Sequence, residues 1–286
     1  MRIALLQPWL WAHKLPRAVG AETIQLVARL WRARHTLIAV SRVDFRKKYS
    51  GSTLGLLWYP LYAALLLGMY CFIYMVIFPV RFSSAGFGGY DKVLFIFSGL
   101  VPYLGFSEAV SSGAGSIKGN IVLVKNTVFP IELIPVKHVL VSIAGLSISL
   151  ALVLLMIAPT RHFGWHLLYL PVPVVLLTLF SLATVWILSA VAVLIPDINY
   201  VVNLVLLFFL FVSPIGYEWS QVPPGALAFV YGNPMTYLID SFRYALIGMR
   251  ELPLWSDLAF LGTAVAGAAL GGSFFRRLMP LFSDHE

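Results

Sequence analysis

The chain has 286 residues, of which 60% are apolar and 11% charged; its formal net charge is +8 and its mean hydropathy is +0.87. So few charged side chains could not cover the surface of a water-soluble domain of this size. Several apolar runs continue for about 20 residues, which excludes an outer-membrane barrel, whose strands alternate over about 10. We therefore expect an all-α protein that crosses a membrane several times.

Residues 1–55 form a basic segment ahead of the first span. Its apolar side chains recur near one stripe at helical spacing, and basic side chains occupy much of the rest. A helix of this kind lies in the membrane interface, with its basic residues beside lipid headgroups. The stripe comprises Ile24, Val27, Trp31, Ile38, Phe45 and Tyr49. We assign Arg42, Phe45, Arg46, Lys47 and Lys48 to the interfacial helix.

Residues 56–286 form the second unit, a membrane domain with six predicted spans. The spans are 56–78, 93–111, 139–158, 170–195, 201–216 and 258–275. The fifth is the shortest, with 16 residues. A transmembrane helix normally needs about 20 residues to cross the hydrocarbon layer, so this span is only marginally long enough.

Lys and Arg residues are distributed unequally between the two sides of these spans. Fifteen lie before the first span, between spans two and three, or in the tail, whereas five lie on the opposite side. The positive-inside rule therefore places both termini in the cytoplasm. The basic charge then faces anionic membrane lipids, so we expect no nucleic-acid partner.

Two connecting segments are too polar or too broken to span. The cytoplasmic segment 112–136 is rich in Gly, Asn and Lys, and connections of this length usually have a function of their own. The external segment 217–255 contains two apolar stretches, 226–231 and 235–247, separated by Gly and Pro. We interpret them as two short re-entrant helices before the last span, because buried neighbours can satisfy their broken backbone.

Tyrosines gather on one side of the first span. Tyr59, Tyr62, Tyr70 and Tyr74 fall within an arc of about 120° at helical spacing. A phenol hydroxyl deep in hydrocarbon needs a partner, so the stripe faces either a pore or another helix. Tyr59 and Tyr74 also fit an interfacial aromatic belt. On the fifth span a similar face comprises Tyr200, Asn203 and Phe211.

Motifs for common enzymes are missing from the sequence. A P-loop needs G-x-x-x-x-G-K-[ST], and no Gly-Lys pair occurs anywhere in the chain. His162 and His166 lie four residues apart without a third nearby metal ligand. We therefore expect no catalytic residue, no metal site and no cofactor in this chain. The span interiors carry almost no charge, which disfavours an ion-coupled secondary transporter or a membrane-embedded enzyme or assembly factor.

Several motifs occur in an order that is similar to one family of transporters. Phe45-Arg46-Lys47-Lys48-Tyr49-Ser50-Gly51-Ser52-Thr53-Leu54-Gly55-Leu56-Leu57-Trp58 precedes the first span. Later matches are Ser116 to Asn120, Lys125 to Pro130, Ser213-Pro214-Ile215-Gly216-Tyr217, Asn233-Pro234 and Arg243. From Arg42 onward the chain resembles type-2 ABC transporter permeases, especially the bacterial O-antigen, capsule and teichoic acid exporters. Pro196-Asp197-Ile198 departs from the family's usual Arg-Asp-Ile.

The resemblance implies an exporter of lipid-linked polysaccharide in the bacterial inner membrane. It also implies a homodimer with two copies of a separate cytoplasmic ATPase, which binds ATP and Mg²⁺, and spans one and five lining the conduit. Energy must then arrive through a contact, and segment 112–136 is the candidate surface. We predict that Ile117, Asn120, Lys125 and Phe129 dock onto the ATPase. A teichoic acid or small-lipid exporter remains an alternative.

Overall fold

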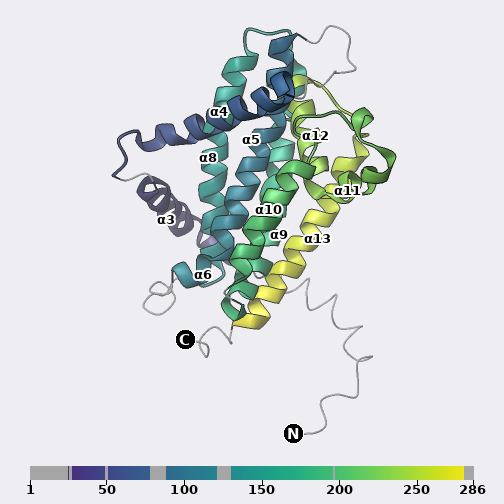
Figure 1. The fold of residues 1–286 in the computed structure, drawn as a ribbon. Coiled ribbons are helices and arrows are strands. Elements are labelled where there is room, and N and C mark those ends of the chain that lie inside the picture. Colours follow the sequence, from purple (N-terminus) through teal and green to yellow (C-terminus); the bar gives the residue numbers. More distant parts are fainter. Residues whose placement is uncertain are drawn as a thin grey trace.

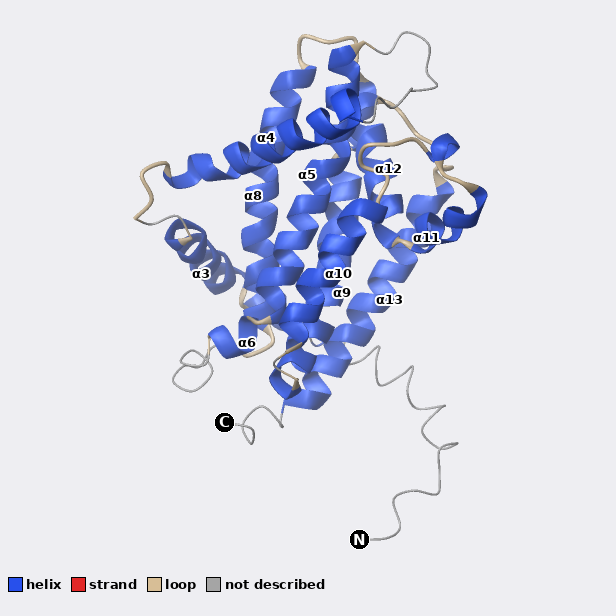
Figure 2. Ribbon diagram, viewed as in Figure 1, coloured by secondary structure: helices blue, strands red, loops and turns tan. Residues whose placement is uncertain are grey.

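The computed structural model describes residues 25, 28–48, 51–77, 88–120, 130–195 and 197–279. Every regular element in these ranges is a helix (Figure 2), which confirms the predicted all-α class. Five helices in the described ranges are long and apolar enough to cross a membrane. They are α4 with its π-helical continuation (Trp58–Ile77), α5 (Gly89–Ala114), α8 (Leu133–Ile157), α9 with the preceding 3₁₀ turn (Trp165–Leu194) and α13 (Trp255–Leu278).

The fifth predicted span is shorter than expected. Helix α10 covers Ile198–Val212 and ends before Ser213, whose backbone is extended, instead of continuing to residue 216. The next residue is Pro214, and a residue before proline is pushed out of the helical region. The predicted total of six spans therefore depends on this 15-residue helix.

The third span begins earlier than predicted, at Leu133 instead of residue 139. Pro135 lies in the first turn of α8, where the missing backbone N–H breaks no helical hydrogen bond. Helix α5 in turn extends to Ala114. The polar connection 112–136 is therefore shorter than its sequence suggests, and it contains the short helix α6 (Ser116–Gly119).

Helix α5 occupies the centre of the bundle and packs against α8, α9, α10 and α12. Its glycines permit these close approaches, as small residues do between membrane helices. A Cβ at Gly113 would lie 2.4 Å from Cγ1 of Val185 on α9, and one at Gly99 would lie 3.1 Å from Cγ2 of Ile239 on α12. The outer helix α13 packs mainly on α9 (Figure 1).

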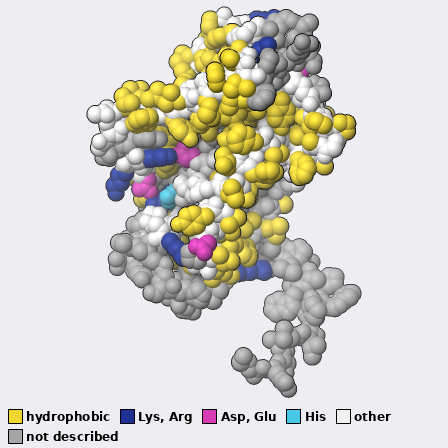
Figure 3. All heavy atoms as spheres, in the orientation of Figure 1, with side chains coloured by type: hydrophobic (Ala, Val, Ile, Leu, Met, Phe, Trp, Pro, Cys, Tyr) yellow, Lys and Arg dark blue, Asp and Glu magenta, His cyan; other side chains and the backbone are white. Residues whose placement is uncertain are grey.

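Helix α4 (Trp58–Cys71) differs from its neighbours because it crosses the bundle obliquely (Figure 1). It continues without interruption into a π-helix, Phe72–Ile77. It contacts α5 and α8, but only 11% of its most apolar stretch is buried within the chain. Hydrophobic side chains cover this face of the molecule over α4, α10 and α11 (Figure 3).

Helix α3 (Arg34–Lys47) lies against the first turns of α8. Leu37 is its buried apolar contact, while Trp31 and Ile38 of the predicted stripe are exposed on the side away from the bundle. Arg42, Arg46 and Lys47 are exposed as well. Phe45 of the stripe faces the bundle and stacks on Tyr59, and Ile24, Val27 and Tyr49 lie outside the described residues. The placement of α3 in a membrane interface stays a prediction.

The opposite end of the bundle carries α11 (Leu227–Gly232) and α12 (Pro234–Ile247), which coincide with the two predicted apolar stretches. Asn233 caps α12 by accepting a hydrogen bond from the amide of Met235 at 2.9 Å, and Gly248 ends it in the left-handed conformation. The fully buried Arg243 donates to the carbonyl of Pro214 at 2.7 Å. Arg243 thereby ties α12 to the broken end of α10.

Two histidines in the connection between α8 and α9 also hold this end of the bundle together. His162 lies 2.8 Å from Asp91 at the start of α5 and 3.1 Å from the carbonyl of Ile247. His166 lies 3.0 Å from the carbonyl of Ala245. Both rings therefore contact protein groups at this end of the bundle.

Candidate functional site

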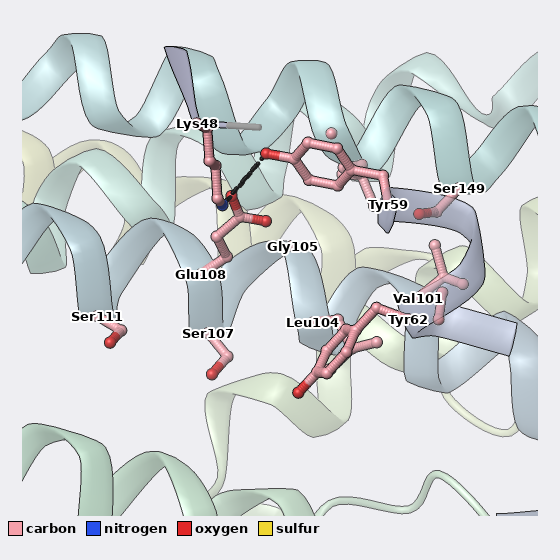
Figure 4. Close-up of a pocket in the computed structure, with 13 residues that line it drawn as sticks. Lys48, Tyr59, Tyr62, Val101, Leu104, Gly105, Ser107, Glu108, Ser111 and Ser149 are labelled. Atoms are coloured by element: carbon pink, nitrogen blue, oxygen red, sulfur yellow. Dashed lines mark hydrogen bonds and ion pairs between the residues drawn. The ribbon is translucent and has the colours of Figure 1, made fainter. Parts of the chain in front are cut away.

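A pocket of about 360 Å³ opens between α4, α5 and α8, toward the end of the bundle where α3 and α6 lie. In Figure 4 Lys48, Glu108 and the Tyr59 hydroxyl point toward one another, whereas Ser107, Ser111 and the Tyr62 hydroxyl point away from that group. Figure 3 shows charged side chains gathered beside α3 and α6 on this face. The pocket is lined by Lys48, Tyr59, Tyr62, Ala63, Val101, Leu104, Gly105, Ser107, Glu108, Ser111, Gly145, Leu146 and Ser149.

An ion pair closes one side of the pocket. Lys48, directly after α3, pairs with the Glu108 carboxylate on α5, and its Nζ donates to the Tyr59 hydroxyl at 3.3 Å. The Tyr59 hydroxyl donates to Oε1 of the same carboxylate at 2.8 Å (Figure 4). Because the three groups come from α3, α4 and α5, this triad fixes the relative positions of three helices.

Tyr59 is a rigid wall of the pocket. Its ring stacks on Phe45 of α3, with centroids 5.3 Å apart and planes 13° from parallel. On the other side it lies over Gly145 of α8, where a Cβ would stand 2.1 Å from Cε1 of the ring. A larger residue at position 145 would therefore displace Tyr59 and its hydroxyl.

Hydroxyl groups extend from this triad along α5 and α8. Ser107, Ser111 and Ser149 line the pocket, and Ser111 donates a hydrogen bond to Oδ1 of Asn203 at 2.7 Å. Asn203 lies on α10, so this contact links the pocket to the exposed face of that helix. Hydroxyls beside apolar walls suit a ligand with polar rims and apolar faces. The hydroxyls can form hydrogen bonds to its rims, and the apolar walls can contact its faces.

The structure divides the tyrosine stripe that the sequence suggested. Tyr59 and Tyr62 line the pocket, and Tyr62 is 58% exposed. Tyr70 is only 3% exposed, with its hydroxyl 3.5 Å from the carbonyl of Leu210. Tyr74 packs over Gly216, where a Cβ would lie 2.4 Å from its ring. Tyr70 therefore packs beside the C-terminal end of α10, and Tyr74 packs on the segment that follows it. An arc of about 120° is wide enough for one stripe to meet two different sets of neighbours.

The face predicted on α10 remains open within the chain. Tyr200 and Phe211 are exposed, as is Asn203. The buried side of α10 is formed by Val202 and Leu206. Both helices of the predicted conduit thus present exposed aromatic side chains, although only Tyr59, Tyr62 and Asn203 are connected to the pocket.

The residues predicted to dock an ATPase lie in different surroundings. Ile117 is 2% exposed and belongs to the same buried cluster as Leu37, Leu133 and Trp186, so its side chain holds α6 in the core. Asn120 accepts a hydrogen bond from Lys137 at 2.6 Å. Lys125 and Phe129 lie outside the described residues.

Sequence reasoning overlooked the roles of Lys137 and Gly145. Its position places Lys137 among the basic residues between predicted spans two and three, but its side chain is buried at the start of α8. A single lysine within an otherwise apolar helical run was the available signal. No sequence signal marked Gly145, because the need for glycine there arises from Tyr59 in a distant segment.

Comparison with known proteins identifies the family. The family model described as ABC-2 type transporter matches residues 39–247, which include the C-terminal part of α3, the pocket, α10 and α12. An "O-antigen export system permease protein RfbA" of Myxococcus xanthus is 29% identical over 80% of this chain and 86% of its own length. A relative of the same name from Klebsiella pneumoniae is 24% identical over 87% of this chain and 93% of its own length. The chain is therefore a multi-pass membrane protein that belongs to the ABC-2 type transporter family.

Proposed function

We propose that this chain is the permease subunit of an ABC exporter that carries a lipid-linked polysaccharide of the O-antigen class across the bacterial inner membrane. The observation that carries the proposal is similarity to O-antigen export permeases over 80–87% of this chain. The similarity also extends over 86–93% of the length of those relatives.

A separate ATPase subunit supplies the energy in this proposal. The sequence has no P-loop, whose backbone amides and lysine would hold the phosphates of ATP. ATP and Mg²⁺ therefore bind to the partner, two copies of which dock on the α6 side of a permease pair. The segment that begins at α6 is the proposed docking region, with Lys125 and Phe129 as direct contacts and Ile117 and Asn120 as its supports.

A second copy of the chain completes the conduit. Support comes from α4 and α10, whose outward faces are apolar apart from a few polar groups such as the hydroxyls of Tyr62 and Tyr200. Phenol hydroxyls in lipid lack hydrogen-bond partners, which costs free energy. A homodimer that brings these faces together around a hydrated path gives the hydroxyls water or substrate as partners.

The pocket then forms the cytoplasmic end of the path. The excess of Lys and Arg on the α3 and α6 side supports a cytoplasmic location for that end and for both termini. Tyr62, Asn203, Tyr200 and Phe211 provide hydroxyl, amide and aromatic contacts along the path. Such groups allow a sugar chain to slide, because each contact is weak and easily exchanged.

The test is co-expression of the tagged chain with ABC ATPase genes from its own genomic neighbourhood, followed by purification and an ATPase assay. A stoichiometric, ATP-hydrolysing partner is expected. Expression of both genes in a strain that lacks its O-antigen permease and ATPase should restore surface polysaccharide. Recovery of the chain without any ATPase would refute the half-transporter proposal, whereas an active complex that exports only teichoic acid or a small lipid would correct the substrate.

A further inference from the structure

Lys137 is a buried cation that joins two separate cytoplasmic-side elements. Its side chain is 2% exposed at the start of α8. Nζ pairs with Oδ2 of Asp44 on α3 at 2.7 Å and donates to Oδ1 of Asn120, directly after α6, at 2.6 Å. A buried ammonium group is costly unless it is both paired and hydrogen-bonded, so both acceptors contribute to holding Lys137 in place.

The α6 side of this connection is itself well anchored. The Asn120 amide group donates to the carbonyl of Ser116 at 2.8 Å, which fixes the side chain to α6. Ile117 of the same helix is buried against Leu37 and Leu133. A displacement of α6 therefore moves the amide that Lys137 contacts.

The α3 side leads to the pocket. Asp44 and Lys48 are four residues apart at the end of α3, so they lie on neighbouring positions one turn apart. Asp44 pairs with Lys137, while Lys48 pairs with Glu108 and contacts Tyr59 in the pocket. One helical turn thus separates a contact with the α6 connection from a contact with the pocket.

We propose that Lys137 is a positioning residue that couples movement of α6 to the pocket through Asp44 and Lys48. This inference rests on the proposed exporter function, because the movement is driven by the ATPase that docks beside α6. When α6 shifts, the ammonium group follows Asn120 to avoid losing a buried hydrogen bond, and α3 follows Lys137 through Asp44. The Lys48–Glu108–Tyr59 triad then changes its geometry and alters access to the pocket.

The structure provides a matched control for simple docking of α3. Arg29 pairs with the buried Glu132 at 2.8 Å, so it also holds the α3 region against the start of α8. Arg29 is half-exposed, and its partner Glu132 lies at the start of α8 and not on α6. Weakening this pair loosens α3, whereas weakening the Lys137 contacts also separates α3 from α6.

The experiment compares Lys137→Met, Lys137→Arg, Asn120→Ala, Asp44→Asn and Arg29→Gln in the complete permease–ATPase complex in proteoliposomes. ATP hydrolysis and ATP-driven movement of a lipid-linked polysaccharide are measured on the same preparation. Assembly is checked by co-purification. We expect Lys137→Met and Asn120→Ala to lower polysaccharide moved per ATP by about tenfold, within the usual range of coupling between sites. Lys137→Arg and Arg29→Gln should keep the ratio within about twofold of the unmodified complex.

The double variant Lys137→Met/Asp44→Asn separates the proposed connection from independent effects. If Asp44 acts through Lys137, the double variant moves as much polysaccharide per ATP as Lys137→Met alone. An unchanged ratio in Asn120→Ala, or an equal loss in Arg29→Gln, would overturn the inference while the unmodified complex still exports. If Lys137→Met fails to assemble with the ATPase, the ratio of polysaccharide moved to ATP hydrolysed in Asn120→Ala and Asp44→Asn decides whether the connection couples α6 to the pocket. A wild-type complex that hydrolyses ATP but moves no polysaccharide would instead refute the proposed substrate.

Discussion

Helices α5 and α4 are both long and apolar enough to span a membrane, but they have opposite surroundings. In the most apolar stretch of each, 78% of the residues of α5 are buried within the chain, against 11% for α4. Glycines of α5 lie in close contact with α8, α9 and α12, whereas nothing lies within 4 Å of the Cβ position at Gly68 on α4. Hydropathy therefore identifies a span, but packing determines whether that span supports the fold or remains available for lipid and partners.

The sharpest test of this contrast is the same substitution in each helix. Phe97 on α5 is fully buried, and Phe72 at the end of α4 is exposed. We expect Phe97→Ala to lower the free energy of unfolding by about 3–5 kcal/mol, because it leaves a cavity in the core. Phe72→Ala should change it by no more than about 0.5 kcal/mol. Thermal unfolding of the detergent-purified chain measures both values.

Phe72→Ala should also weaken the proposed homodimer, since its side chain is exposed within the chain. Cross-linking or mass measurement in detergent follows the dimer fraction. Phe97→Ala serves as the comparison, and only its folded fraction is measured. Equal stability losses in the two variants would mean that α4 is as tightly packed as α5, and the comparison would fail.

Two glycines provide the second pair. Gly145→Ala places a methyl group 2.1 Å from the Tyr59 ring, so the ring must move; we expect a loss of about 1–3 kcal/mol, typical of overpacking. Gly68→Ala meets no neighbour and should stabilise α4 by up to about 1 kcal/mol through helix propensity. The unfolding midpoints should move in opposite directions. A stable Gly145→Ala protein would show that Tyr59 can leave its place without cost.

Two tyrosines on α4 itself give the third test. Tyr62→Leu alters the exposed pocket wall, so export should fall while the free energy of unfolding changes by no more than about 0.5 kcal/mol. Tyr70→Leu removes a buried side chain beside α10 and should destabilise the chain by about 1–3 kcal/mol. Export in cells and thermal stability are compared for both. Normal export with Tyr62→Leu would remove this residue from the proposed path.

The smallest effect is expected on α3, where Arg46 and Lys47 are exposed. Arg46→Gln with Lys47→Gln removes two exposed charges, each of which attracts an anionic membrane by about 1 kcal/mol. Amide exchange within α3 should rise by about fivefold or more in nanodiscs of anionic lipid. In zwitterionic nanodiscs the variant and the original protein should exchange alike. A rise in both lipids would point to loss of internal packing instead.

The fold class, the spans and the two short helices before the last span were predictable because they depend on local hydropathy and on proline and glycine. The end of α10 at Val212 was predictable in principle from Pro214. The pocket was only partly predictable: Tyr59 and Tyr62 were identified, but helical spacing could not reveal that Tyr70 is buried. The contacts of Lys137 and Gly145 were beyond sequence reasoning, because their partners Asp44 and Tyr59 lie about 90 residues earlier in the chain.

The π-helical turn at Phe72–Ile77 has a consequence for how related chains diverge. A π turn corresponds to one surplus residue within an otherwise α-helical segment. A relative that lost one residue from this stretch would regain a regular α-helix there, and the side chains before and after the lost residue would keep their directions, because the wide turn already absorbs the surplus residue. A single-residue gap there would therefore mark the loss of the wide turn, accomplished without exchanging the side chains that face α10, such as Tyr70.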